Sequence, residues 1–140
     1  MRFTVAVLAM TGMMAFGAFS ARGTVAAQQA KSQWDGVYTE EQAKRGEGFY
    51  SQYCASCHGP DLAGGEFSSN WNDLSLGELF ERMRISMPQN APGSLSRQQN
   101  ADILAFVLFK SNFPAGTTEL SGQTDVLNTI KFIASKPNAQ

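Results

Sequence analysis

The segment Cys54-Ala55-Ser56-Cys57-His58 places two thiols two residues apart, with an imidazole directly after the second thiol. This arrangement is the attachment signature of c-type haem. Two intervening residues let each sulfur bond a different vinyl group of one porphyrin, and the next residue then lies under the iron. We therefore expect one covalent haem c, with Cys54 and Cys57 as its attachment points and His58 as the proximal iron ligand.

Two other interpretations of this motif fit the rest of the chain poorly. A redox-active dithiol of the thioredoxin type would lie in an alternating strand–helix pattern, and the sequence has no such pattern. A zinc site needs about four ligands, whereas the chain contains two cysteines and one histidine. The context therefore favours haem, which would form part of the hydrophobic core.

The N-terminus has the layout of a secretory signal peptide. Arg2 precedes a mostly apolar run over residues 3–19, and Val25-Ala26-Ala27 offers a small-residue cleavage site before Gln28. The alternative is a retained membrane anchor, because the run approaches the ~20 residues that span a bilayer. We expect residues 1–27 to be a cleaved signal peptide and the mature protein to be periplasmic, an uncleaved anchor being the alternative.

The remainder is long enough for one domain and too short for two. Removing residues 1–27 takes away Arg2 and Arg22 and leaves 9 Lys and Arg against 12 Asp and Glu, a net charge of −3. A nucleic-acid-binding domain would be basic, so this balance argues against nucleic acid as a partner. We expect a leader over residues 28–37 and a single domain over residues 38–140.

Three N-terminal helix signals organise this domain. The segments 39–42, 75–78 and 96–99 each begin with Ser or Thr and carry Glu or Gln three residues later, which is the pattern of a capping box. The first predicts a helix from Thr39 to about Tyr53, entering the haem motif. The other two precede apolar residues at helical spacing. These predict one helix from Ser75, with Met83 on its apolar face, and another from Ser96 through Lys110.

A weaker helical pattern follows near the C-terminus. Val126, Leu127, Ile130 and Ile133 suggest a short last helix. Turns rich in glycine and proline separate the predicted helices, and no run alternates like a strand. The sequence therefore predicts a small all-α domain of three to five helices wrapped around one haem.

The sixth iron ligand is expected to be a methionine. His58 is the only histidine, and downstream of residue 27 the methionines are Met83 and Met87. Met83 falls on the apolar face of a predicted helix, where core packing is the usual role. Met87 precedes Pro88 in a loop, and a proline that restricts the backbone suits a loop holding a thioether over iron. We predict Met87 as the ligand; the alternative is an exposed loop residue.

With these residues in place, the chain resembles class I cytochromes c. The spacing of Gly46 and Tyr50 before Cys54 is similar to the first helix of that family, where a glycine lets the first helix approach the last. Phe106 then corresponds to the aromatic residue at the crossing, and the Met87–Pro88 pair to the distal loop. The resemblance covers residues 34–133 and implies the cytochrome c fold.

Several shorter segments resemble a bacterial subgroup of this family. They are residues 35–46, 86–88, 92–96 and 112–116, which look like cytochrome c domains found with quinoprotein alcohol and sugar dehydrogenases. The resemblance implies a periplasmic dehydrogenase, of the quinoprotein kind in this subgroup, as electron donor. It also implies an oxidase or another cytochrome as acceptor, through small and transient contacts.

The chain departs from the family between the proximal and distal sides. Family members usually carry a proline ten to twelve residues after the proximal histidine, and its carbonyl accepts the other ring N–H. No proline lies between Pro60 and Pro88 here, so another carbonyl must orient His58. In similar cytochromes a tryptophan ahead of the methionine helix donates to a haem propionate. Trp71 is therefore a candidate haem contact, the alternative being an aromatic that only packs.

The expected function is single-electron transfer without catalysis, because no second motif supplies an acid, a base or a nucleophile. Ligation by His58 and Met87 would leave no open coordination position on the iron. Two alternatives are a gas-binding sensor or weak peroxidase with an open sixth site, and a structural subunit of a larger dehydrogenase.

Overall fold

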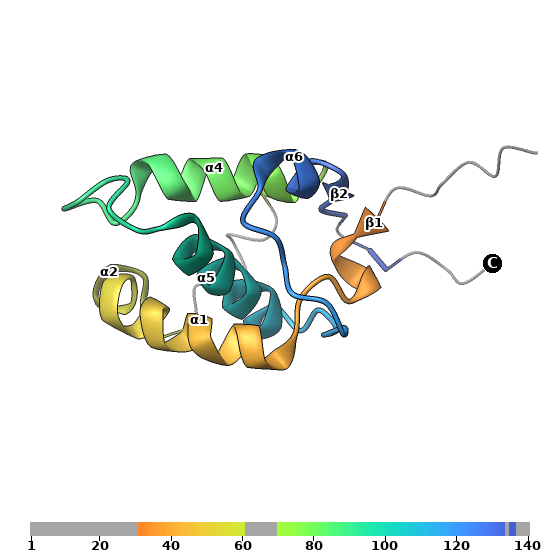
Figure 1. Ribbon diagram of the computed structural model, residues 1–140, viewed down its shortest axis with the longest axis horizontal. Helices are drawn as coiled ribbons and strands as arrows, with labels where there is room; N and C mark the ends of the chain where they lie inside the picture. Colours follow the sequence, from red (N-terminus) through yellow and green to blue (C-terminus); the bar gives the residue numbers. More distant parts are fainter. Residues whose placement is uncertain (1–30, 61–69, 134, 137–140) are drawn as a thin grey trace, which may run out of the picture.

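Helices make up nearly all the regular structure in the part of the chain that the computed structural model describes, residues 31–60, 70–133 and 135–136 (Figure 1). The expected all-α fold is confirmed. The α-helices are α1 (Glu40–Tyr53), α2 (Ala55–His58), α4 (Leu76–Ser86), α5 (Arg97–Lys110) and α6 (Thr124–Leu127). A 3-10 helix, η1 (Gln33–Asp35), and two short strands, β1 (Lys31–Ser32) and β2 (Ile130–Lys131), complete the described elements.

The crossing of α1 and α5 is the central contact of the fold. A Cβ atom on Gly46 would lie 1.8 Å from the carbonyl oxygen of Asp102, so only glycine lets the two backbones approach this closely. One helical turn further on, the rings of Tyr50 and Phe106 meet with centroids 5.1 Å apart. The expected pairing of the first helix with the last long one is therefore confirmed.

The core is centred on α5, whose residues from Asn100 to Leu108 are all buried. Phe80 and Leu76 of α4 reach it from one side, and both are fully buried. Tyr38, at the entry to α1, is also fully buried, and its hydroxyl donates to the carbonyl of Phe113 at 2.6 Å. A long helix buried almost all round explains why α5 serves as the platform for the other helices.

Two of the three predicted capping boxes form as expected. The side chains of Ser75 and Ser96 accept the N–H of Glu78 and Gln99, and each partner side chain returns to the backbone N–H of its serine. Each serine is the N-cap, and the helices begin directly after it, at Leu76 and Arg97.

The third capping box is only half formed. Thr39 accepts the N–H of Gln42, so the start of α1 is as predicted. The Gln42 amide turns into the core instead of returning to Thr39. It donates to the carbonyl of Leu120 at 2.9 Å and accepts the N–H of Leu120 at 2.6 Å. Satisfying two buried backbone groups outweighs closing an exposed cap.

The predicted C-terminal helix is wrong beyond Leu127. The helix α6 covers only Thr124–Leu127, and Ile130 lies in β2. There it pairs in parallel with Lys31 of β1. The apolar spacing that suggested a longer helix is therefore shared between a helical turn and a strand whose partner is about 100 positions away in the sequence.

The described part of the predicted leader packs on the domain. Gln33 is fully buried and bonds both backbone polar groups of Ile133, while the indole of Trp34 donates to the same carbonyl at 3.1 Å. The Trp34 ring also meets Phe113 edge-on, with centroids 4.6 Å apart. The predicted signal peptide, residues 1–27, lies outside the described residues. Among the described helices, none has the length and apolarity needed to cross a bilayer.

Candidate haem-binding site

Cys54 is the joint between α1 and α2. Its N–H donates to the carbonyl of Tyr50 at 2.8 Å, which ends α1. Its own carbonyl accepts the N–H groups of Cys57 at 3.1 Å and His58 at 3.0 Å, which forms the single turn of α2. The three expected haem-binding residues therefore lie on one helical turn continuous with the long helix that packs on the core.

A hydroxyl from α1 fixes the peptide that follows this turn. The Tyr50 side chain is 1 % exposed, and its OH donates to the carbonyl of Gly59 at 2.8 Å. Gly59 has φ 71°, a left-handed conformation that suits glycine and turns the chain away after His58. The sequence places Tyr50 at the helix crossing, but its second role, holding the turn after His58, depends on the tertiary structure.

The two cysteines differ in environment. Cys54 is half-buried against the core, and burial raises the pKa of its thiol, so the thiol stays protonated at neutral pH. Cys57 is exposed, and no disulfide joins the pair. No group of three His, Cys, Asp or Glu side chains among the described residues is placed to hold one metal ion.

Met87 ends α4 and begins the loop to α5. Its N–H donates to the carbonyl of Met83 at 2.9 Å, its backbone is extended, and its side chain is half-buried. Pro88, directly after it, is buried. Met83 packs against the hydrophobic core from α4, which agrees with the packing role expected for it.

The Met87–Ser96 loop and α2 lie at the same end of the long axis of the molecule (Figure 1). Two tight turns shape the loop, in which the N–H of Ala91 donates to Pro88 at 2.9 Å and the N–H of Ser94 to Ala91 at 3.2 Å. This placement agrees with proximal and distal ligands that approach one haem from two segments of the chain. Met87 as the sixth ligand stays a prediction.

Trp71 precedes α4 by five residues in the sequence and is 9 % exposed. Its ring packs edge-on against Phe132, with centroids 5.6 Å apart. The indole N–H makes no hydrogen bond to any residue in the described ranges, so this donor is available to a bound group. Packing is thus established for Trp71, and its expected bond to a haem propionate stays a prediction.

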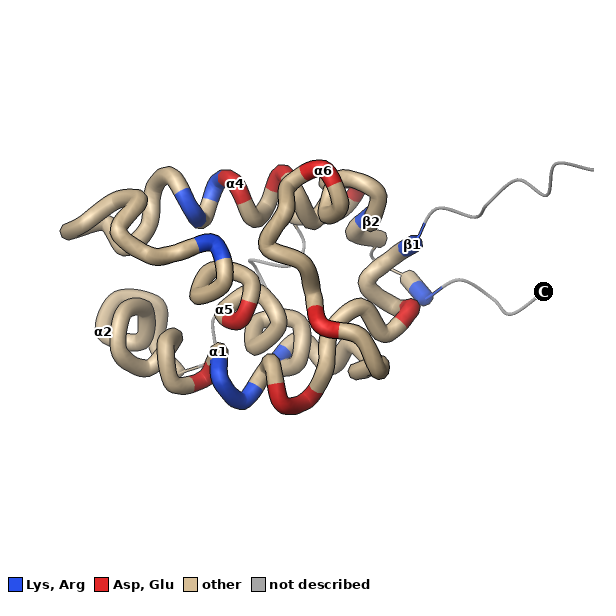
Figure 2. The backbone as a smooth tube through the Cα atoms, in the orientation of Figure 1, with Lys and Arg blue, Asp and Glu red and all other residues tan. Residues whose placement is uncertain are grey.

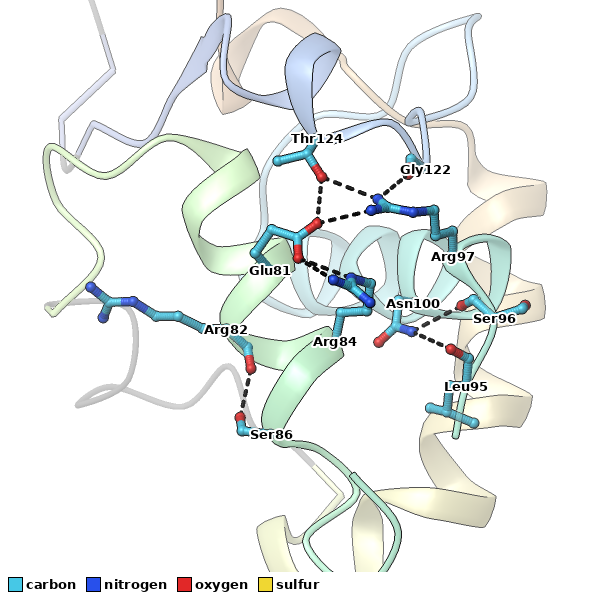
Figure 3. A network of polar contacts seen from close by, with 10 residues as sticks. All are labelled: Glu81, Arg82, Arg84, Ser86, Leu95, Ser96, Arg97, Asn100, Gly122 and Thr124. Carbon is cyan, nitrogen blue, oxygen red and sulfur yellow. Dashed lines mark hydrogen bonds and ion pairs between the residues drawn. The ribbon is translucent and has the colours of Figure 1, made fainter. Parts of the chain in front are cut away.

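An ion-pair cluster centred on Glu81 links α4 with α5 and α6 (Figure 3). Glu81 accepts hydrogen bonds from Arg84 at 2.7 Å, Arg97 at 3.3 Å and the hydroxyl of Thr124. Hydrogen bonds from Arg84 and Thr124, aided by the positive charge of both arginines, lower the pKa of Glu81 to about 2. The Arg84 pair is an i,i+3 contact within α4, whereas Arg97 of α5 and Thr124 of α6 reach Glu81 only through the tertiary structure.

Positive charge gathers on the half of α4 that leads into the Met87–Ser96 loop, where Arg82 and Arg84 lie, with Arg97 at the start of α5 (Figure 2). The acidic residues of α4 lie in its first half. This order opposes the helix dipole and stabilises α4.

Two surface cavities occur elsewhere on the molecule. They have volumes of about 360 and 370 Å³ and lie along α1 and the end of α5, each lined by Phe109 and Glu40. Neither is lined by the predicted haem-binding residues. Residues 61–69, part of the stretch between Pro60 and Pro88 that lacks the family's proline, lie outside the described residues.

Comparison with known proteins gives a match to one family model. Residues 41–107 match the family model of cytochrome c oxidase, cbb3-type, subunit III. The matched segment begins in the first turn of α1 and ends in α5, so it contains the Cys54–His58 turn and Met87. No curated protein and no solved structure matches the chain significantly. The matched segment, the helical fold and the Cys54–His58 turn together support a c-type cytochrome, and the spacing of Cys54, Cys57 and His58 is consistent with covalent attachment of haem c.

Proposed function

We propose that this chain is a periplasmic single-electron carrier, with one haem c bound covalently by Cys54 and Cys57 and ligated by His58 and Met87. One observation carries the proposal: the Cys54–His58 turn and the Met87–Ser96 loop lie at the same end of a helical fold, within the segment that matches a cytochrome c family model (Figure 1). The bound haem would supply a one-electron iron couple, and the chain would hold and shield it.

The arrangement of the distal loop supports electron transfer over ligand binding. The backbone on either side of Met87 is restrained, by the carbonyl of Met83 before it and by the buried ring of Pro88 after it. A restrained thioether stays on the iron and raises the reduction potential relative to harder ligands. An open-site gas sensor or weak peroxidase would need Met87 to stand away from the iron, and no described contact draws it away.

Partners are proposed from surface chemistry and from the comparisons. Ile85, two residues before Met87, is 61 % exposed and lies beside exposed Arg82, which offers a small mixed patch for a transient contact. The matching family model is named for an oxidase subunit, which supports a respiratory oxidase or another cytochrome as acceptor. A periplasmic dehydrogenase, of the quinoprotein kind, is proposed as donor on the sequence resemblance alone.

Export is proposed on the sequence of residues 1–27. Expression in a bacterium with haem c maturation should give a periplasmic protein whose mass equals the chain from Gln28 plus one haem. A full-length product retained with membranes would favour the uncleaved anchor.

The ligand set is tested by optical spectroscopy of the purified holoprotein. A far-red sulfur-to-iron band in the ferric form, with no binding of carbon monoxide to the ferrous form, supports the electron carrier. A high-spin ferric spectrum with ready carbon monoxide binding would contradict the electron carrier and favour a haem with an open sixth site. A stable monomer with reversible redox behaviour would contradict a purely structural subunit.

A further inference from the structure

Three side-chain amides are fully buried in the described part of the fold: Gln33, Gln42 and Asn100. The two glutamines each use both ends of the amide. Gln33 bonds the N–H and the carbonyl of Ile133, and Gln42 bonds the N–H and the carbonyl of Leu120. Each glutamine thus satisfies one buried peptide of a loop while leaving none of its own polar atoms unpaired.

Asn100 uses only its donors. Its Nδ2 donates to the carbonyl of Leu95 at 3.2 Å and to that of Ser96 at 2.9 Å, as Figure 3 shows. Its Oδ1 is buried and has no hydrogen-bond partner among the described residues. A buried acceptor without a partner is destabilising, and native folds usually avoid it.

An apolar residue at position 100 would avoid this unpaired acceptor. Asn100 lies three, four and seven residues before Ile103, Leu104 and Val107, so it occupies the apolar face of α5 that those buried residues define. A leucine would match this face and would bring no unpaired oxygen. The polar residue at an apolar-face position therefore calls for a role other than stability, because rules of local consistency are broken chiefly at functional sites.

The two carbonyls that the Asn100 amide group binds indicate that role. Leu95 and Ser96 are the last residues of the loop that begins at Met87, and Leu95 is buried. The other end of the loop is fixed by the bond from the Met87 N–H to Met83. Between the two ends, the bonds from Ala91 and Ser94 are local turns within the loop. Asn100 thus ties the C-terminal base of the loop to the core.

We propose that Asn100 is a positioning residue for the methionine ligand. It would hold the Met87–Ser96 loop in the conformation that keeps the Met87 sulfur on the iron. This inference rests on the proposed function, which makes Met87 that ligand. A loop held less firmly at one end samples more conformations, so the thioether leaves the iron more often while the rest of the domain stays folded. The affected quantity is the lifetime of the sulfur–iron bond.

The test is the rate at which cyanide binds to the ferric holoprotein, since cyanide enters only after the thioether has left. Asn100→Leu should bind cyanide roughly tenfold faster, equivalent to about 1.4 kcal/mol, and should show a weaker far-red band. Asn100→Ser, whose side chain is too short to reach both carbonyls, should change in the same direction and serves if the leucine variant does not fold.

Gln42→Leu is the matched control, because it removes a buried amide of the same kind from the distant Leu120 loop. It should lower the thermal midpoint and leave the cyanide rate and the far-red band unchanged. Wild-type cyanide rates in both Asn100 variants would overturn the inference, as would an equal acceleration in Gln42→Leu. Met87→Ala separates the two proposals: a retained far-red band in that variant contradicts the ligand assignment itself.

Discussion

Gly46 of α1 and Asp102 of α5 touch backbone to backbone, since a Cβ atom on Gly46 would lie 1.8 Å from the Asp102 carbonyl oxygen. The same atom would lie 3.0 Å from the N atom of Ile103. Neither neighbour can move independently, because both belong to the buried helix around which the core is built. The crossing therefore depends on the absence of a side chain at this one position.

Gly46→Ala should lower the free energy of unfolding by about 3 kcal/mol or more, the upper range for overpacking. The measurement is urea unfolding of the holoprotein followed by circular dichroism. Gly48→Ala is the matched control, because a Cβ there meets nothing within 4 Å on the same helix. It should stabilise the protein by up to about 1 kcal/mol, through helix propensity alone. Similar stability of the two variants would contradict the crossing.

Met87→Ala should abolish the far-red sulfur-to-iron band and let the ferrous protein bind carbon monoxide, because the sixth position loses its ligand. Met83→Ala should retain the band and lower stability by about 2 kcal/mol, since Met83 is a partly buried core residue. Optical spectra and chemical unfolding of both variants test this. Loss of the band in Met83→Ala instead would show that the ligand assignment is wrong.

Glu81 should make the protein sensitive to acid. Its folded pKa of about 2 lies below the ordinary value of 4.5, so the stability it contributes is present above pH 4.5 and is lost as the pH falls towards 2. Glu81→Gln should remove this component. The expected size is on the order of 1 kcal/mol, because the side chain is 27 % exposed and solvent screens its ion pairs.

The measurement for Glu81 is the midpoint of urea unfolding at a series of pH values from about 6 to about 2, which cover the range where the charge of Glu81 changes. Glu47→Gln controls for net charge, because Glu47 has no ion pair with another described residue. Equal acid sensitivity of the Glu81 and Glu47 variants would mean that the cluster of Figure 3 does not carry the effect.

Tyr38 should make the protein sensitive to alkali. Burial, with a smaller effect of the Glu40 charge, raises the pKa of Tyr38 from 10 to about 12. Its contribution is therefore intact below pH 10 and is lost as the pH rises towards 12. Tyr38→Phe should lack this alkaline component and should lose about 1 kcal/mol at neutral pH, because the bond to the Phe113 carbonyl is gone.

The measurement for Tyr38 is unfolding by urea at pH 7 and across the alkaline range. Tyr53→Phe is the control, since Tyr53 is exposed and its substitution should leave stability unchanged. An alkaline loss of the same size in Tyr38→Phe and in the wild type would assign the effect to other groups.

Trp71→Phe should keep the packing on Phe132 and remove the indole donor. If that donor binds a haem propionate, its loss leaves more negative charge beside the iron and favours the ferric form. We expect the reduction potential to fall by about 20–60 mV, the one-electron equivalent of a hydrogen bond. Voltammetry of wild type and variant tests this, and an unchanged potential would leave Trp71 with a packing role alone.

Local rules were sufficient for two of the three capping boxes, in which the signal and its partner lie within one helical turn. Ser75 with Glu78 and Ser96 with Gln99 start their helices where the sequence predicts, because capping requires only a few adjacent residues. The haem motif is local in the same sense, since the α2 turn itself brings Cys54, Cys57 and His58 together.

Local rules failed where a distant segment offered better partners. The amide of Gln42 leaves its cap for Leu120, 78 positions away, and Ile130 leaves the predicted helix to pair with β1. In both cases the hydrogen bonds join segments far apart in the sequence, and the periodicity of apolar residues does not predict such pairings.

The sequence by itself determined the helix starts, the glycine at the crossing and the residues expected to hold a haem. Only the tertiary structure decided that Tyr50 holds the peptide after His58 and that Asn100 holds the base of the Met87–Ser96 loop. The physical reason is that neither composition nor residue spacing predicts which side chain will bind a given backbone carbonyl. Such a hydrogen bond exists only once tertiary packing has brought the donor and that carbonyl together and reduced the access of water.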